Sequence, residues 1–202
     1  MKSKRIVVYG GAFNPPHIGH KEVVEYLLTV RGIDQVIVAP CGIHRIKGEF
    51  TVPFHHRLEM TRILFKDMPE VIVSDIDQVP GETTEGSGST LALLEKVKDL
   101  YGCKDLKHKI YSVIGQDNAD NIACWYKSEV LIEKWPFIVL PRGIHSPSDG
   151  AWYLQEPHIY ASDFRRVSAS STEIRRNLMS TLLPEPIFRY ILQFNLYDLY
   201  KK

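Results

Sequence analysis

Short apolar runs alternate with helix-patterned segments along this chain, and the alternation restricts the fold more than any other feature. The runs that are bounded by turn or polar residues predict strands over residues 6–9, 35–39, 71–76, 110–114, 137–140 and 158–161. Between them, apolar residues recur at three- and four-residue spacing, which predicts helices near 23–28 and over 57–65, 89–101 and 128–135. Strands that alternate with helices form a parallel sheet covered on both faces. We therefore expect an α/β fold with a doubly wound parallel sheet.

Two more helices are expected at the C-terminal end. One begins at Ser170, since Ser170 and Glu173 have the spacing of a capping box, and the other begins after Pro186. Residues 141–150 are rich in Pro, Gly and Ser and lack periodicity, so they indicate a loop and not a domain boundary. A chain of 202 residues fits one domain, and we expect a single domain over 1–202 with a helical part from about residue 168.

Charge, cysteine content and hydropathy exclude several classes of protein. The 25 Lys and Arg nearly balance the 24 Asp and Glu, which is unlike the basic footprint of a dedicated nucleic-acid binder. Cys41, Cys103 and Cys124 are odd in number and form no CxxC pair, so neither a disulfide framework nor a zinc site is predicted. No apolar run reaches the ~18 residues of a membrane span. We expect a cytoplasmic protein that binds neither membrane nor nucleic acid.

Residues 10–20, GGAFNPPHIGH, follow the first strand directly and run into a helix. Ligands of open parallel sheets bind at this place, beyond the carboxyl ends of the strands. Gly10 and Gly11 allow a backbone turn without side chains, and a helix N-terminus presents unpaired N–H groups to an anion. His17 and His20 are three residues apart and would share a helix face. The segment therefore predicts a phosphate-binding loop.

Other interpretations of the loop stay open at this point. The two histidines would also suit a surface, a helix cap or a metal pair, but a zinc site needs about three or four protein ligands and no third ligand is evident nearby. We therefore assign no metal ligand. The GxGxxG pattern is absent, and no acidic residue ends the second strand, which argues against a nicotinamide dinucleotide-binding fold.

The string HIGH at 17–20 also occurs in class I aminoacyl-tRNA synthetases, but the chain has no KMSKS-like lysine loop. HxGH is shared more widely by nucleotidyltransferases, and four motifs in order make the resemblance specific. GGAFNPPHIGH at 10–20, IGQDNADNIACW at 114–125, Pro141-Arg142-Gly143 and SSTEIR at 170–175 each match a family motif, as does the tail at 182–197. The chain resembles bacterial nicotinate-nucleotide adenylyltransferases over nearly its whole length.

The resemblance implies a Rossmann-like fold and an enzyme of NAD biosynthesis. Its activity would be adenylyl transfer from ATP to nicotinate mononucleotide, which gives nicotinate adenine dinucleotide and pyrophosphate. The implied partners are ATP and a pyridine mononucleotide, the implied cofactor is Mg²⁺ carried by ATP, and association into a homo-oligomer stays open.

The resemblance also assigns residues to three groups. The catalytic group is His17, His20 and Arg175. The ATP-binding group adds to these Gly10, Gly11, Ala12, Phe13, Gly115, Asp117, Ser170, Ser171 and Thr172. The mononucleotide-binding group is Asn14, His44, Arg45, Lys47, Ser89, Thr90, Trp125 and Arg142. In these groups Asp117 would bind the adenosine ribose region and Trp125 would stack on the pyridine ring. From the residues alone, a helix cap at 170–172, a turn at Asp117 and a core position for Trp125 are alternatives.

Four places depart from the family pattern, and one of them is Gly42-Ile43-His44-Arg45, which stands where the family has a PPHK-like element. Ala12 stands where Thr or Ser is frequent, and Asn14 where Asp is frequent. The segment GSGSTL at 86–91 replaces a Tyr-Thr pair that helps to recognise nicotinate, so nicotinamide mononucleotide or dual specificity stays open. Another HxGH transferase, such as pantetheine-phosphate adenylyltransferase or a cytidylyltransferase, and a non-catalytic nucleotide-binding module are the remaining alternatives.

Overall fold

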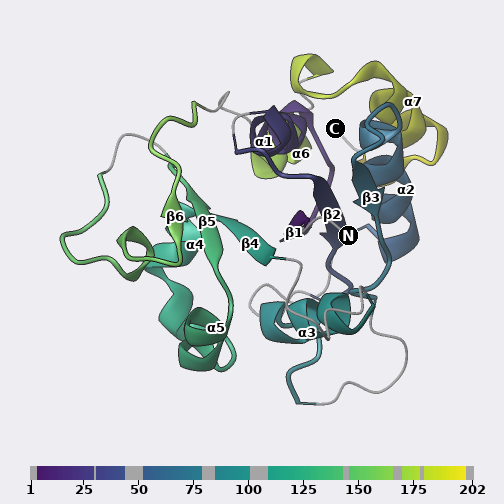
Figure 1. Ribbon diagram of the computed structural model, residues 1–202. Helices are drawn as coiled ribbons and strands as arrows, with labels where there is room; N and C mark the ends of the chain where they lie inside the picture. Colours follow the sequence, from purple (N-terminus) through teal and green to yellow (C-terminus); the bar gives the residue numbers. More distant parts are fainter. Residues whose placement is uncertain are drawn as a thin grey trace.

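A computed structural model describes residues 4–29, 31–43, 52–78, 85–100, 109–142, 146–165, 170–177 and 180–198. Its centre is a sheet of six strands in the order β3-β2-β1-β4-β5-β6, and every neighbouring pair is parallel (Figure 1). The strands are β1 (Arg5–Gly11), β2 (Gln35–Pro40), β3 (Val71–Val73), β4 (Lys109–Gly115), β5 (Phe137–Leu140) and β6 (Ile159–Tyr160). The predicted doubly wound, Rossmann-like α/β fold is confirmed.

Helices cover both faces of the sheet because successive side chains of a strand point to opposite sides. On β1, Val7 joins one apolar core while Ile6 and Val8 join the other. The core around Val7 is closed by α1 (Ile18–Thr29), α2 (Phe54–Phe65), α6 (Ser171–Asn177) and α7 (Glu185–Gln193). The core around Ile6 is closed by α3 (Thr90–Leu100), α4 (Gln116–Asp120) and α5 (Ser128–Lys134).

Several predicted boundaries need correction. Strand β3 ends at Val73 and not at residue 76, because the Ser74 hydroxyl accepts a hydrogen bond from the Ile76 N–H at 3.2 Å and the chain turns there. Helix α7 already begins at Glu185, and Pro186 lies in its first turn, where a proline costs no hydrogen bond.

Short helical segments were not predicted at all, because runs of three to five residues carry too little periodicity. They are α4, η2 (Ile122–Cys124), η3 (Trp152–Leu154), η4 (Ser180–Leu182) and η5 (Leu196–Asp198). Within the described ranges, no helix combines the length and the apolar character that crossing a membrane requires.

The strand order reverses its direction of winding at β1, which has β2 on one side and β4 on the other. Such a switch point leaves a crevice beyond the carboxyl ends of the strands. Gly11, Pro40 and Gly115 end β1, β2 and β4 at this edge. The segment 10–20 begins at the end of β1 and therefore lies at the crevice.

Candidate active site

A cavity of about 620 Å³ occupies the crevice beyond β1, β2, β4 and β5. Nearly all of the predicted site residues that the structure describes line it. They are Gly10, Gly11, Ala12, Asn14, His17, His20, Ser89, Thr90, Gly115, Asp117, Trp125, Arg142, Ser170, Ser171, Thr172 and Arg175. Phe13 instead packs beneath the loop, with 1% of its surface exposed. His44, Arg45 and Lys47 lie outside the described residues.

The first half of the phosphate-loop segment is held by donors from β2 and α2. The Cys41 N–H donates to the Gly11 carbonyl at 2.8 Å, and Arg57 Nη1 donates to the Ala12 carbonyl, also at 2.8 Å. Arg57 is only 1% exposed, and its Nε donates to the Val52 carbonyl at 3.1 Å. Burial lowers the pKa of Arg57. Sequence reasoning missed this residue, which looked like any polar position of an amphipathic helix.

The second half is held by the C-terminal part of the chain. Arg175 Nη1 donates to the Asn14 carbonyl at 2.5 Å, and Ser171 Oγ donates to the Pro15 carbonyl at 3.0 Å. The Tyr197 hydroxyl donates to Asn14 Oδ1 at 2.8 Å. Tyr197 was also missed as a site residue. Its contact depends on a left-handed backbone conformation with φ of 68°, which a tyrosine in a sequence does not reveal.

Arg175 therefore supports the loop in addition to lining the cavity. Its other terminal nitrogen, Nη2, donates to Thr172 Oγ1 at 3.2 Å. The guanidinium thus connects the first turn of α6 to the loop that precedes α1, as a forked donor can.

His17 and His20 lie together, as predicted. Their ring centroids are 3.8 Å apart, and the His17 backbone N–H donates to His20 Nδ1 at 3.1 Å. Because Nδ1 accepts this bond, the ring proton of neutral His20 is on Nε2. His17 is 1% exposed and precedes α1, whereas His20 lies in its first turn. Among the described residues, no group of three His, Cys, Asp or Glu side chains is arranged to hold a metal ion.

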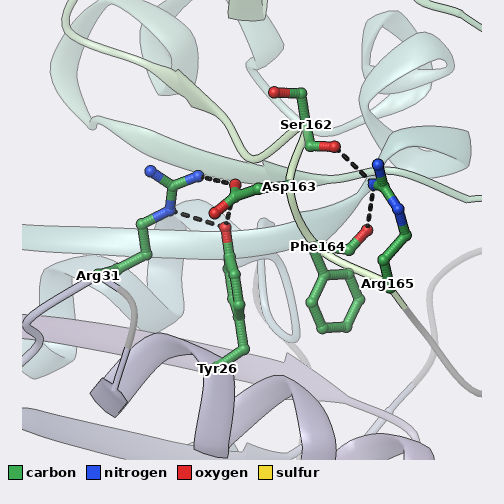
Figure 2. Close-up of polar contacts among 6 residues, drawn as sticks. All are labelled: Tyr26, Arg31, Ser162, Asp163, Phe164 and Arg165. Atoms are coloured by element: carbon green, nitrogen blue, oxygen red, sulfur yellow. Dashed lines mark hydrogen bonds and ion pairs between the residues drawn. The ribbon is translucent and has the colours of Figure 1, made fainter.

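A polar cluster fixes the segment that leads toward α6 (Figure 2). The Tyr26 hydroxyl on α1 donates to Asp163 Oδ1 at 2.7 Å, and Arg31 Nε donates to the same hydroxyl at 2.8 Å. Arg31 also forms an ion pair with Asp163. Next to it, the Phe164 ring packs 4.9 Å from the Tyr26 ring and lines the cavity.

At the β4 edge, Asp117 forms an ion pair with Arg142. Asp117 was predicted to bind ATP and Arg142 to bind the mononucleotide, and the ion pair places these two residues side by side in the cavity. A Cβ atom at Gly115 would come within 2.6 Å of Asp117 Oδ1, so the glycine leaves room for this carboxylate.

Another part of the cavity wall is formed by the N-terminus of α3. Ser89 precedes this helix, and its Oγ accepts a hydrogen bond from the Ala92 N–H at 3.2 Å. Gly86 and Gly88 before it adopt φ of 86° and 69°, a conformation that favours glycine. A Cβ atom at Gly86 would lie 2.8 Å from the Tyr126 ring, so this turn packs next to the segment that carries Trp125. Trp125 is half-buried and lines the cavity.

Comparisons with known proteins agree with this geometry. The family model for cytidylyltransferase-like proteins matches residues 8–177. A "Probable nicotinate-nucleotide adenylyltransferase" of Fusobacterium nucleatum is 32% identical over 178 residues, which are 86% of this chain and 87% of the relative. A protein of the same name from Sulfurimonas denitrificans is 30% identical over 198 residues, 98% of this chain and 95% of the relative.

A solved structure shares the fold. It is the Plasmodium falciparum nicotinic acid mononucleotide adenylyltransferase complexed with NaAD, with a TM-score of 0.78 at 24% identity. The alignment covers 98% of this chain and 100% of that one. From the family model and the two relatives, the chain belongs to the nicotinate-nucleotide adenylyltransferases, within the cytidylyltransferase-like proteins.

Proposed function

We propose that the chain transfers the adenylyl group of ATP to nicotinate mononucleotide and releases pyrophosphate, a step of NAD biosynthesis. A phosphate oxygen of the mononucleotide attacks the α-phosphorus of ATP, and the bond from that phosphorus to the leaving pyrophosphate breaks. The observation that carries the proposal is the His17–His20 pair, set beside a loop whose carbonyl groups are clamped at the switch point of the sheet.

Such a transfer needs positioning and charge stabilisation, and no protein nucleophile. His20 would donate its Nε2–H to a phosphoryl oxygen, since its Nδ1 already accepts from the His17 backbone. His17 would bind an oxygen of the same triphosphate. Ser170, Ser171 and Thr172 would add hydroxyl donors at the start of α6.

Arg175 would act mainly by holding the loop. Two of its nitrogens already donate to Asn14 and Thr172, and a phosphate would bind beside a guanidinium that is fixed in place.

Mg²⁺ belongs to the proposal as an ion that arrives with ATP. The residues that line the cavity suit an ion bound in this way, because magnesium keeps several waters, binds through substrate phosphates and requires few protein ligands. The ion would neutralise charge on the triphosphate.

Different parts of the cavity would bind different substrates. We assign the adenosine to the part lined by Asp117 and the pyridine ring to the space between Trp125 and the N-terminus of α3. A ring carboxylate at that helix N-terminus is favoured by its unpaired N–H groups and its positive dipole end.

A cytoplasmic location completes the proposal, supported by the free thiols Cys41 and Cys124.

A pyrophosphate-release assay tests the function. The enzyme is supplied with ATP and Mg²⁺ and with nicotinate mononucleotide, nicotinamide mononucleotide or phosphopantetheine in turn, and with CTP in place of ATP as a further arm. We expect the greatest kcat/KM with ATP and nicotinate mononucleotide, and a product with the mass of nicotinate adenine dinucleotide. Absence of turnover with both pyridine mononucleotides would refute the proposal, and turnover in another arm would identify the alternative transferase.

A further inference from the structure

Asp77 is a buried acid at the edge of the cavity that the proposed reaction does not use. It follows β3 after the turn at Ser74, is 4% exposed and lines the cavity. Its main-chain carbonyl accepts a hydrogen bond from the Gly42 N–H at 3.2 Å. This bond attaches the residue to the end of β2, on the α3 side of the cavity.

The carboxyl group of Asp77 has no hydrogen-bond donor among the residues that the structure describes. Among the described residues, the titratable groups that face it are the Cys41 thiol after β2 and the Lys96 ammonium on α3. Lys96 Nζ donates to the Ile76 carbonyl at 3.2 Å. Burial raises the pKa of Cys41 to about 11, so the thiol stays neutral near pH 7. The Arg57 guanidinium interacts with that thiol.

An ionised carboxylate without donors is costly to bury. Burial accordingly raises the pKa of Asp77 to about 7, although Lys96 opposes the shift. The carboxyl group can therefore be a hydrogen-bond donor when protonated and an anionic acceptor when ionised, and the change falls near neutral pH.

The two forms suit different pyridine substituents. A ring carboxylate accepts from a protonated acid and is repelled by an ionised one, whereas the NH₂ of a ring carboxamide donates to the ionised form. Ser89 and Thr90 at the N-terminus of α3 also line the cavity, and the turn before them packs on Ile43, the neighbour of the Gly42 that bonds Asp77. A helix N-terminus favours an anion at every pH. The α3 terminus and Asp77 would thus act together on one substituent.

We propose that Asp77 is a specificity-determining residue that reads the ring substituent of the pyridine mononucleotide, favouring nicotinate when protonated and nicotinamide when ionised. The inference rests on the proposed function and extends it, since it names the group that sets the choice between the two substrates.

The test is the ratio of kcat/KM for nicotinate mononucleotide to kcat/KM for nicotinamide mononucleotide, measured from pH 6 to pH 8 with ATP and Mg²⁺. Groups that act on the parts shared by the two substrates affect both reactions alike and cancel in the ratio. We expect the ratio to fall about tenfold over this range. A difference of one unit between the pKa of Asp77 with nicotinate mononucleotide bound and with nicotinamide mononucleotide bound would produce this change. Where nicotinamide mononucleotide turns over too slowly, its inhibition constant against the nicotinate form replaces its kcat/KM.

Two variants complete the experiment. Asp77→Asn keeps the shape but cannot titrate, so its ratio should be independent of pH. Asp75→Asn removes an exposed carboxylate two residues away and should keep the parental slope. A pH-independent ratio in the parent, or an equal slope in Asp77→Asn, would overturn the inference and leave the adenylyl transfer intact. Absence of turnover with both mononucleotides would overturn both.

Discussion

The buried guanidinium of Arg57 offers a direct test of how the phosphate-loop segment is held. Replacement by methionine keeps an unbranched stem and removes the donors to the carbonyls of Ala12 and Val52. Each buried carbonyl left without a donor costs about 1–3 kcal/mol, so the variant should lose about 2–6 kcal/mol of unfolding free energy. Domains are stable by about 5–15 kcal/mol, so most of the variant should still be folded at 25 °C.

Thermal unfolding followed by circular dichroism measures this loss. At ~2–4 °C per kcal/mol for a chain of this size, Tm should fall by roughly 10 °C. Below the transition, kcat should also fall, because the Ala12 carbonyl no longer has its anchor and the loop can rearrange. Arg57→Lys, which restores one donor, should recover part of both losses.

Arg62→Met is the matched control on the same helix. Arg62 is exposed and pairs with Glu59 at 3.4 Å, an arrangement that contributes ~0–1 kcal/mol. If Arg57→Met melted within about 2 °C of Arg62→Met and kept parental kcat, the loop would not depend on the guanidinium and our reasoning would be wrong.

Five further variants address individual residues. His20→Ala should lower kcat by roughly 10²–10³ at saturating ATP without changing Tm appreciably, as loss of a preorganised donor does, and near-parental turnover would contradict its role. Gly115→Ala places a methyl group within 2.6 Å of Asp117 Oδ1. It should raise KM for ATP roughly tenfold, like Asp117→Ala, with little change in Tm, and an unchanged KM would argue against an ATP contact at this carboxylate. Arg175→Ala removes a donor to the loop and should both raise KM for ATP and lower Tm by a few degrees, whereas a change in Tm alone would indicate a purely structural role. Asp77 holds its proton more tightly in the folded state, where its pKa is about 7, than at its ordinary value of 3.8, so its contribution to stability should decline as pH rises from about 4 to 7. Asp77→Asn should remove this decline, which melting curves at pH 5 and pH 8 would detect.

Much of the fold could be predicted because its signals are local. Periodicity placed the long helices and the six strands within a few residues, and the alternation fixed a parallel sheet. Prediction failed where a single side chain redirects the backbone. The predicted strand continues through residues 74–76, yet the Ser74 hydroxyl accepts a hydrogen bond from the Ile76 N–H and the strand ends at Val73.

The site residues, too, separate into those that a local sequence pattern predicts and those that it does not. His17 and His20 could be found because their spacing and the preceding glycines are themselves a pattern. Arg57, Asp77 and Tyr197 could not, because each matters through a partner distant in sequence or through its burial. The ion pair of Asp117 and Arg142 was likewise invisible, since it joins two segments 25 residues apart.

The clamp on the loop also has a consequence for the order in which the protein becomes active during synthesis. The Arg175 and Tyr197 side chains contact Asn14 across 161 and 183 residues of chain. A ribosome makes these anchors long after the histidine motif has emerged. A growing chain therefore carries the motif without a formed site, and adenylyl transfer should begin only when the segment that ends at Tyr197 has left the ribosome and docked.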